Sequence, residues 1–260
     1  MIEQNTQQQK QFKILVIGDN CVDVYRYGSV DRISPEAPVP IFKYSHEESK
    51  PGMGANVVNN LEALGCSVSF FTSTDVSKKI RLIDKRSNQH ILRIDEDVAV
   101  EPLDISLFKN IESYDAIVIS DYNKGTVSYD LVSYLRKNFK GPMFMDTKKQ
   151  DLSQFYGIFV KINELEFKNR WSINNSLIVT LGSKGAMYKT GRDPRHETFF
   201  PVGEVEVVDV TGAGDTFLSS LVFKFLETDS IEDSIKFANK ASAVTVQKFG
   251  VYAPTLEELQ

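Results

Sequence analysis

Short apolar runs and longer amphipathic segments alternate along most of this chain. The runs end in polar or glycine residues, which is typical of strands, and the first one, ending in Gly-Asp, is expected to be a central strand. The predicted strands are 12–19, 67–73, 114–121, 141–146, 157–163, 176–182 and 185–190. Helical spacing predicts helices in 52–65, after its glycines, and at 126–139, 213–227 and 231–248. This alternation indicates an α/β fold with a mostly parallel sheet covered on both faces.

Two segments interrupt the alternation. The proline-rich segment 25–45 cannot form a helix and suits edge strands or an irregular flap. The segment 79–95 has the pattern of a hairpin that turns near residues 87–88. We expect the two segments to pair as a small lid on a single domain that spans 12–260. The polar residues 1–11 are expected to form a flexible tail.

The composition is that of an ordinary globular protein, with 42% hydrophobic and 25% charged residues among 260. A net charge of −5 without a basic block makes nucleic acids and anionic membranes poor candidate partners. No apolar run approaches the ~18 residues of a membrane span, and the N-terminus lacks the apolar core of a signal peptide. Cys21 and Cys66 match no metal or disulfide pattern, so we expect reduced thiols in a cytoplasmic protein.

The stretch VVDVTGAGDTFLSSLV, at 207–222, carries the most specific chemical pattern. A helix N-terminus offers unpaired N–H groups, and the glycines beside it let a phosphate approach the backbone closely. Residues 211–214 would form such an anion cradle, and Asp215 would point from the first turn into the same pocket. A cradle beside a carboxylate suits phosphoryl transfer from ATP to a hydroxyl. The alternative is a purely structural helix start with Asp215 favoured by the helix dipole.

The common nucleotide-binding motifs are missing. The chain has no GxxxxGK[ST] sequence, so it has no P-loop. PGMGAN lacks the third glycine of GxGxxG and follows the proline-rich segment instead of the first strand, which argues against a dinucleotide site.

Three motifs together resemble one family. DVTGAGDTF, PGMGANVVNNLEALG and NELE resemble, in the same order along the chain, the signatures of the ribokinase-like (PfkB) sugar kinases. GDNCVDVYRYG, DRISPEAPVPIFK and SDYNKG resemble more closely one branch, the kinases of D-glycero-β-D-manno-heptose 7-phosphate. The resemblance implies a three-layer α/β sandwich with a small β lid that often pairs two subunits, and hence a homodimer.

The resemblance implies roles on the sugar side of the site. Asp215 would be the catalytic base, with residues 212–214 as its anion hole. Asp19 and Asp23 would hold sugar hydroxyls, unless they only solvate the ends of strands. Three residues of the PGMGAN motif would let the backbone and one amide reach the sugar, unless they only form a tight helix start: Gly52, Gly54 and Asn56.

The resemblance also implies roles on the nucleotide side. Asn163 and Glu166 would organise Mg²⁺ near the phosphates, with Glu166 acting through water, or they would simply cap a helix. Thr211 belongs to the phosphate cradle. Three further residues would lie near ribose or phosphate and one beside the adenine: Thr180, Gly182 and Gly185, and Asn239. The cofactors are then ATP and Mg²⁺, with a monovalent cation as an open option.

The acceptor implied by this branch already carries a phosphate, which a basic residue must hold. Lys124 and Lys148 are the candidates, because they lie near Asp121 and Asp146 at expected strand ends, where ligands of open α/β sheets bind. Either lysine is as readily explained as solvated surface. The three histidines show no metal spacing.

The chain departs from the family pattern by two deletions. One lies between the strand at 67–73 and the lid hairpin, and the other follows the NELE motif. Each is expected to uncover a sheet edge or face. Because the chain ends soon after the kinase motifs, we expect no fused nucleotidyltransferase domain. The expected function is an ATP-dependent sugar kinase, with a kinase of another sugar or nucleoside, or a non-catalytic sugar-phosphate binder, as alternatives.

Overall fold

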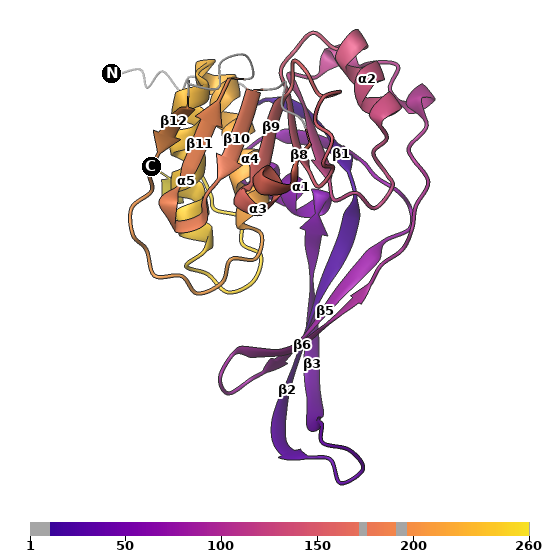
Figure 1. Ribbon diagram of the computed structural model, residues 1–260, viewed down its shortest axis with the longest axis vertical. Coiled ribbons are helices and arrows are strands. Elements are labelled where there is room, and N and C mark those ends of the chain that lie inside the picture. The colour runs from indigo at the N-terminus through magenta and orange to yellow at the C-terminus, as the bar shows by residue number, and fades with distance from the viewer. Residues whose placement is uncertain (1–10, 172–175, 191–196, 260) are drawn as a thin grey trace, which may run out of the picture.

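The computed structural model describes residues 11–171, 176–190 and 197–259. It consists of an α/β body and a lid of long strands that extends away from it (Figure 1). Most of the predicted tail at 1–11 lies outside the described residues.

The body is built on an eight-stranded sheet. In spatial order, its strands are β12 (Glu197–Phe200), β11 (Ala186–Lys189), β10 (Ser176–Thr180), β9 (Phe159–Asn163), β8 (Met143–Thr147), β7 (Ala116–Asp121), β1 (Lys13–Gly18) and β4 (Ser67–Phe71). The six strands from β10 to β4 are parallel, whereas β11 runs antiparallel to both of its neighbours. The predicted mostly parallel sheet is therefore confirmed.

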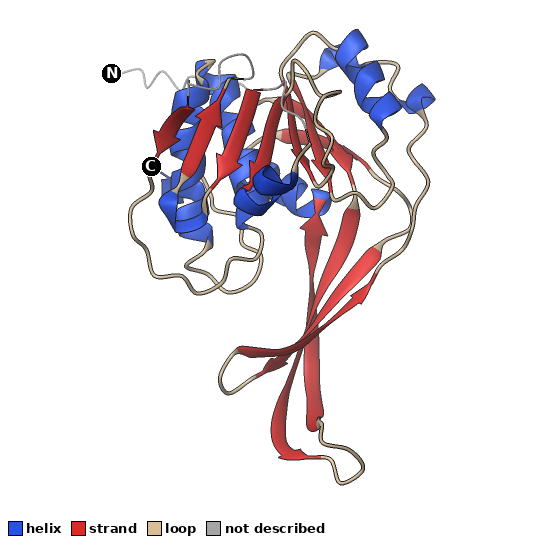
Figure 2. Cartoon of the chain, in the orientation of Figure 1, coloured by secondary structure: helices blue, strands red, loops and turns tan. Residues whose placement is uncertain are grey.

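Helices lie on both sides of this sheet (Figure 2). They are α1 (Gly54–Ala63), α2 (Tyr129–Asn138), α3 (Glu164–Asn169), α4 (Ala213–Thr228) and α5 (Ile231–Thr245). Because alternate residues of a strand face opposite sides, β1 contributes to two cores. Ile14 and Val16 pack with residues of α1, α4 and α5 on one face, and Leu15 and Ile17 pack with residues of α2 on the other.

The lid is a second sheet of four strands. Their spatial order is β3 (Pro40–Met53), β2 (Asn20–Ile33), β5 (Ser77–Asp84) and β6 (Gln89–Glu96). The prolines of the predicted flap lie in or next to the turn between β2 and β3, where no ladder bond is lost. The structure thus joins the segments 25–45 and 79–95 in one lid, as expected from the sequence.

Three features differ from the expectations or were not foreseen. Strand β1 is flanked on both sides, but it lies next to the edge strand β4 and not at the centre of the sheet. Strand β12 was missed, since its four residues are too few to show a pattern. A short helix, α3, forms directly after the NELE asparagine despite the small room there.

The short connection after β4 explains the position of this strand at the edge of the sheet. Only residues 72–76 connect β4 to the lid strand β5, so no further strand is added beyond β4 and it closes the sheet on that side. Among the described residues, no helix is long and apolar enough to cross a membrane.

Candidate active site

Helix α4 begins within the glycine-rich motif. Gly212 is its N-cap with a left-handed φ of 80°, and a Cβ there would lie 2.9 Å from the Asn56 amide nitrogen. Glycine alone fits this position without strain. The first N–H groups of a helix have no acceptor within it and form the positive end of its dipole. The predicted cradle, residues 212–214, therefore lies at a helix end that favours anions.

Asp215 lies in the first turn of α4 and is 5% exposed. Its Oδ2 accepts a hydrogen bond from the Asn56 amide at 2.8 Å, and its Oδ1 accepts one from the Tyr122 hydroxyl at 3.0 Å. Burial raises the pKa of Asp215 to about 6, and the nearby charge of Asp146 acts in the same direction. The two hydrogen bonds and the Lys161 charge oppose this rise. A carboxylate with this pKa is mostly ionised at neutral pH and suited to act as a general base.

A buried ion pair borders the cradle. Lys161 of β9 places its Nζ 2.7 Å from Asp146 Oδ2, and the two side chains are 4% and 6% exposed. A Cβ on Gly214 would lie 2.9 Å from this ammonium group. Lys161 was not among the residues predicted for the site, although a charged residue inside the apolar strand sequence FVKIN indicates that it is paired.

Two of the residues that the sequence placed at the sugar, Asp23 and Gly52, lie at the root of the lid, the part of its strands next to the body. Asp23 of β2 forms a buried ion pair with Arg81 of β5, whose guanidinium carbon lies 5.3 Å from the centre of the Tyr25 ring. A Cβ on Gly52 would overlap the Asp23 carboxylate, so this glycine lets β3 pass close to the pair. The predicted sugar ligand Asp23 therefore has a fixed cationic partner that the sequence did not identify.

Asp19 is held differently from Asp23. It is 1% exposed, and its carboxylate accepts the backbone N–H groups of Tyr122, Lys124 and Thr126 at 2.7, 3.1 and 3.3 Å. The Gly54 N–H donates to its carbonyl at 2.9 Å. Asp19 thus fixes the loop after β7 and so positions Tyr122, a residue of the SDYNKG motif to which sequence reasoning gave no role.

Asn163 and Glu166 form a capping box at the start of α3. The Asn163 side chain accepts the Glu166 N–H at 2.9 Å, and the Glu166 carboxylate accepts the Asn163 N–H at 2.8 Å. The other oxygen of Glu166 is ion-paired with Lys148. Asn163 and Glu166 therefore cap a helix, which was the alternative to a role in organising Mg²⁺. Capping does not prevent the same two residues from also acting near the phosphates of ATP.

The carboxylates near Lys148 fit a magnesium ion held through water. Asp146 Oδ1 is buried without a hydrogen-bond partner among the described residues and lies 3.9 Å from Lys148 Nζ. No group of three or more acidic, histidine or cysteine residues in the described part of the chain is arranged as a direct metal site. Mg²⁺ usually keeps several waters and is held by one or two carboxylates together with phosphates, which suits Asp146 and Glu166.

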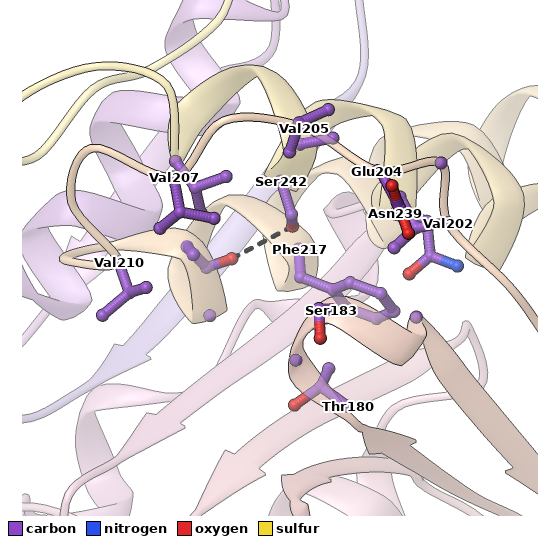
Figure 3. Close-up of a pocket in the computed structure, with 17 residues that line it drawn as sticks. Thr180, Ser183, Val202, Glu204, Val205, Val207, Val210, Phe217, Asn239 and Ser242 are labelled. Atoms are coloured by element: carbon purple, nitrogen blue, oxygen red, sulfur yellow. Dashed lines mark hydrogen bonds between the residues drawn. The ribbon is translucent and has the colours of Figure 1, made fainter.

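A cavity of about 510 Å³ lies on the other side of the cradle. It brings together four residues that the sequence placed at the nucleotide, Thr180, Gly182, Gly185 and Asn239, and two residues of the cradle, Ala213 and Gly214. Val205, Val207 and Val210 lie on one side of it, with Thr180 and Ser183 on the other (Figure 3). Ligand pockets are commonly this large and mostly apolar with a few polar groups.

Two of the predicted nucleotide residues have partners within the protein. The Asn239 amide donates to the Phe200 carbonyl at 2.9 Å, which leaves its side-chain oxygen on the cavity side of α5 as a possible acceptor. The hydroxyl and the N–H of Thr211 both donate to Asp209, at 2.7 and 2.9 Å, and this fixes the turn before the cradle.

The predicted phosphate-holding lysines are both ion-paired. Lys124 Nζ lies 2.6 Å from Asp97 Oδ2, and Lys148 forms ion pairs with both Glu166 and Asp146. Asp121, which the sequence placed beside them, accepts a hydrogen bond from Lys149 at 2.8 Å.

Comparison with known proteins agrees with this geometry. The profile of the pfkB family carbohydrate kinases matches residues 151–258. The bifunctional protein HldE of Sulfurimonas denitrificans is 33% identical over 95% of this chain, and that of Helicobacter acinonychis is 32% identical over 95%. Nearly the whole chain is thus similar to the HldE proteins, and its residues 151–258 are similar to the pfkB family carbohydrate kinases. The chain spans 63% and 65% of the lengths of these two relatives.

Solved structures of two sugar-related kinases share the fold. Phosphofructokinase-2 from Escherichia coli superimposes with a TM-score of 0.75 at 17% identity, over 96% of this chain and 97% of that one. Ribokinase from Arabidopsis thaliana, solved with ribose and ATP, gives 0.71 at 14% identity, over 96% and 98%. The ribokinase-like sandwich with a β lid, expected from the motifs, is confirmed.

The match to one of the relatives also includes gaps in this chain. The match to the Sulfurimonas protein extends over 308 positions but covers only 95% of a 260-residue chain, so about 60 positions face gaps in this chain. This chain is therefore shorter than the matched part of that relative, while the three motifs remain.

Proposed function

We propose that this protein is an ATP-dependent sugar kinase. It would transfer the γ-phosphoryl group of MgATP to a hydroxyl of a phosphorylated sugar, with the anomeric hydroxyl of D-glycero-β-D-manno-heptose 7-phosphate as the favoured acceptor. The observation that carries this proposal is the position of Asp215. It lies buried in the first turn of α4, directly after Ala213 and Gly214, which line the cavity, and its partner Tyr122 lies 5.2 Å from Lys79 of the lid, measured from the ring centre to Nζ.

The proposed chemistry starts with the sugar hydroxyl at Asp215. Each carboxylate oxygen accepts one hydrogen bond within the protein and keeps a lone pair for the hydroxyl proton. As the proton moves to Asp215, the sugar oxygen bonds to the γ-phosphorus and the bond from that phosphorus to the bridging oxygen of ADP breaks. Negative charge on the transferred group is stabilised by the N–H groups of the cradle and by the adjacent Lys161.

Other residues of the chain would prepare this step. Asn56 and Tyr122 hold the carboxylate of Asp215 in one orientation. Asp146 and Glu166 would hold Mg²⁺ through water, and the ion would neutralise charge on the phosphates. The lid would close over the sugar and exclude water, which limits the hydrolysis of ATP.

The apolar side of the cavity suits the base of a nucleotide. Its valines and Phe217 offer an apolar surface, and Asn239 offers a polar group beside it. The ATP complex of the Arabidopsis ribokinase supports ATP as the donor. The relatives named bifunctional protein HldE support the heptose-phosphate branch that the motifs resemble.

The decisive experiment measures ADP release with MgATP and heptose 7-phosphate for the wild type and for Asp215→Asn. The variant keeps the size and a hydrogen-bonding side chain but cannot accept the proton, so we expect a loss of at least about a hundredfold, within the range for general base catalysis. Turnover of another sugar or of a nucleoside in a parallel panel would show that the protein is a kinase with a different acceptor. Binding of a sugar phosphate without turnover of any acceptor would instead identify a non-catalytic binder.

A further inference from the structure

Most charged side chains around Asp215 are already paired. Three buried or partly buried ion pairs lie around the site: Asp23 with Arg81, Asp146 with Lys161, and Glu166 with Lys148. Lys50, which also reaches the root of the lid, donates to the Val251 carbonyl at 3.3 Å. The charges that line the site are thus largely balanced within the protein.

Lys79 is the exception. Its ammonium group has neither an ion pair nor a hydrogen bond with any residue in the described part of the chain. The neighbour opposite it on β6 is Asp95, and that carboxylate is paired with Arg93 at 2.8 Å instead. A partly buried ammonium group without an anionic partner keeps its charge available to a ligand.

The position of Lys79 places this free charge in the site. It lies on β5 opposite Asp23 of β2, so the two side chains share one face of the lid. Its Nζ is 5.2 Å from the centre of the Tyr122 ring, and the hydroxyl of that ring is bonded to Asp215. Lys79 and the catalytic base are therefore connected through one aromatic side chain.

We propose that Lys79 binds the phosphate group that the sugar acceptor already carries. This inference rests on the proposed kinase function and narrows its substrate class to sugar phosphates. A lysine ammonium is a compact point charge with three donors, which suits a phosphate dianion that approaches in several orientations. The sugar would then extend from Lys79 to Asp215, with its reacting hydroxyl at the base and its phosphate at the lid.

The lid offers a matched control. Lys78 is the adjacent residue on β5, points to the opposite face of the sheet and is exposed. Lys78→Met and Lys79→Met remove the same charge from the same strand, but only the second removes it from the site. Thermal melting of both variants checks that the lid still folds.

The test is calorimetric binding without ATP, so it does not depend on turnover. The probes are three sugar pairs with and without phosphate: heptose 7-phosphate and heptose, fructose 6-phosphate and fructose, and ribose 5-phosphate and ribose. We expect the wild type and Lys78→Met to bind at least one phosphorylated sugar at least tenfold more tightly than the same sugar without its phosphate. Lys79→Met should lose tenfold to a hundredfold of that affinity, about 1.4 to 2.7 kcal/mol, and should leave the unphosphorylated sugar unchanged.

Two results would overturn the role of Lys79. One is a preference for phosphate that survives in Lys79→Met, and the other is a wild type with no such preference in any pair. Neither result decides whether the protein is a kinase, because that question is answered by ADP release, which can also occur with an unphosphorylated sugar as the acceptor. Conversely, absence of turnover in the kinase assay leaves the binding test fully informative.

Discussion

At the scale of single residues, the chemistry depends on how Asp215 is surrounded. Its carboxylate is buried, yet it is held by a neutral amide from α1 and a phenol from the loop after β7. Burial raises the pKa and these donors lower it, so the value of about 6 lies between that of a free aspartate and neutral pH. A base of this strength is ionised at physiological pH without being too weak to accept a proton.

This environment predicts the pH dependence of the proposed reaction. Protonated Asp215 cannot accept the hydroxyl proton, so kcat/KM should fall about tenfold per pH unit below about pH 6 and level off above it. Replacing Tyr122 by Phe removes a hydrogen bond that lowers the pKa, so the acidic limb should move to higher pH. The measurement is kcat/KM between pH 5 and 8 for the wild type and the variant.

Tyr129→Phe is the control for this prediction. Its hydroxyl donates to the Asp151 carbonyl at 3.2 Å, away from Asp215, so the profile should stay that of the wild type. A Tyr122→Phe profile that coincides with the wild type would show that the phenol does not tune the base.

At the scale of elements, the NELE motif combines two tasks in one short helix. The capping box satisfies backbone N–H groups at the start of α3, one of them through Oε2 of Glu166. The other oxygen of this carboxylate, Oε1, pairs with Lys148 near the proposed position of Mg²⁺. Because β9 ends at Asn163, the same residue ends a strand and caps the next helix. The motif is thus explained by local structure as well as by the resemblance to sugar kinases.

The two tasks of this motif are separable by mutation. Asn163→Ala removes the N-cap and should destabilise the fold by about 1 kcal/mol, whereas Asn163→Asp keeps a capping acceptor and should retain most of the stability. Urea unfolding of the wild type and both variants measures this difference. Equal stability of Asn163→Ala and the wild type would mean that the cap contributes little and that the residue serves only the ligand.

At the scale of the whole molecule, the lid has two different faces. The face that carries Lys79 and Arg81 turns charged groups toward the site, while the other face of the same strands carries Leu82, Leu92 and Ile94. Leu92 is 55% exposed and Ile94 is 40% exposed. Apolar residues gathered on an exposed sheet face are typical of an interaction surface.

We therefore expect two copies of the chain to pair through their lids, as the resemblance to ribokinase-like enzymes implies. Leu92→Glu introduces a charge into this contact and should convert a dimer into a monomer, which analytical ultracentrifugation measures. Glu96→Gln, at the end of the same strand, is a control that should leave the dimer intact. A wild type that sediments as a monomer at all concentrations would rule out this pairing.

The sequence by itself determined the class of fold and located the motif on which the proposed chemistry rests. Alternating apolar runs and amphipathic helices indicated a parallel α/β sheet, because such patterns are local and each element must bury its own apolar face. The glycine-rich motif located the cradle and Asp215, since both are consecutive in the chain. The lid was also foreseen from the prolines of 25–45 and the hairpin pattern of 79–95.

Only the tertiary structure decided which distant residues meet at that motif. Tyr122 and Asn56 reach Asp215 from 93 and 159 positions away, and no local pattern encodes such contacts. The pairing of charged residues is also decided by the tertiary structure, because the sequence does not show whether a carboxylate will lie beside a given lysine. Folding pairs Lys124 and Lys148 with carboxylates and leaves Lys79 without a partner among the described residues. The proposed site for the phosphate of the sugar therefore lies at the lid and not at the loops that carry Lys124 and Lys148.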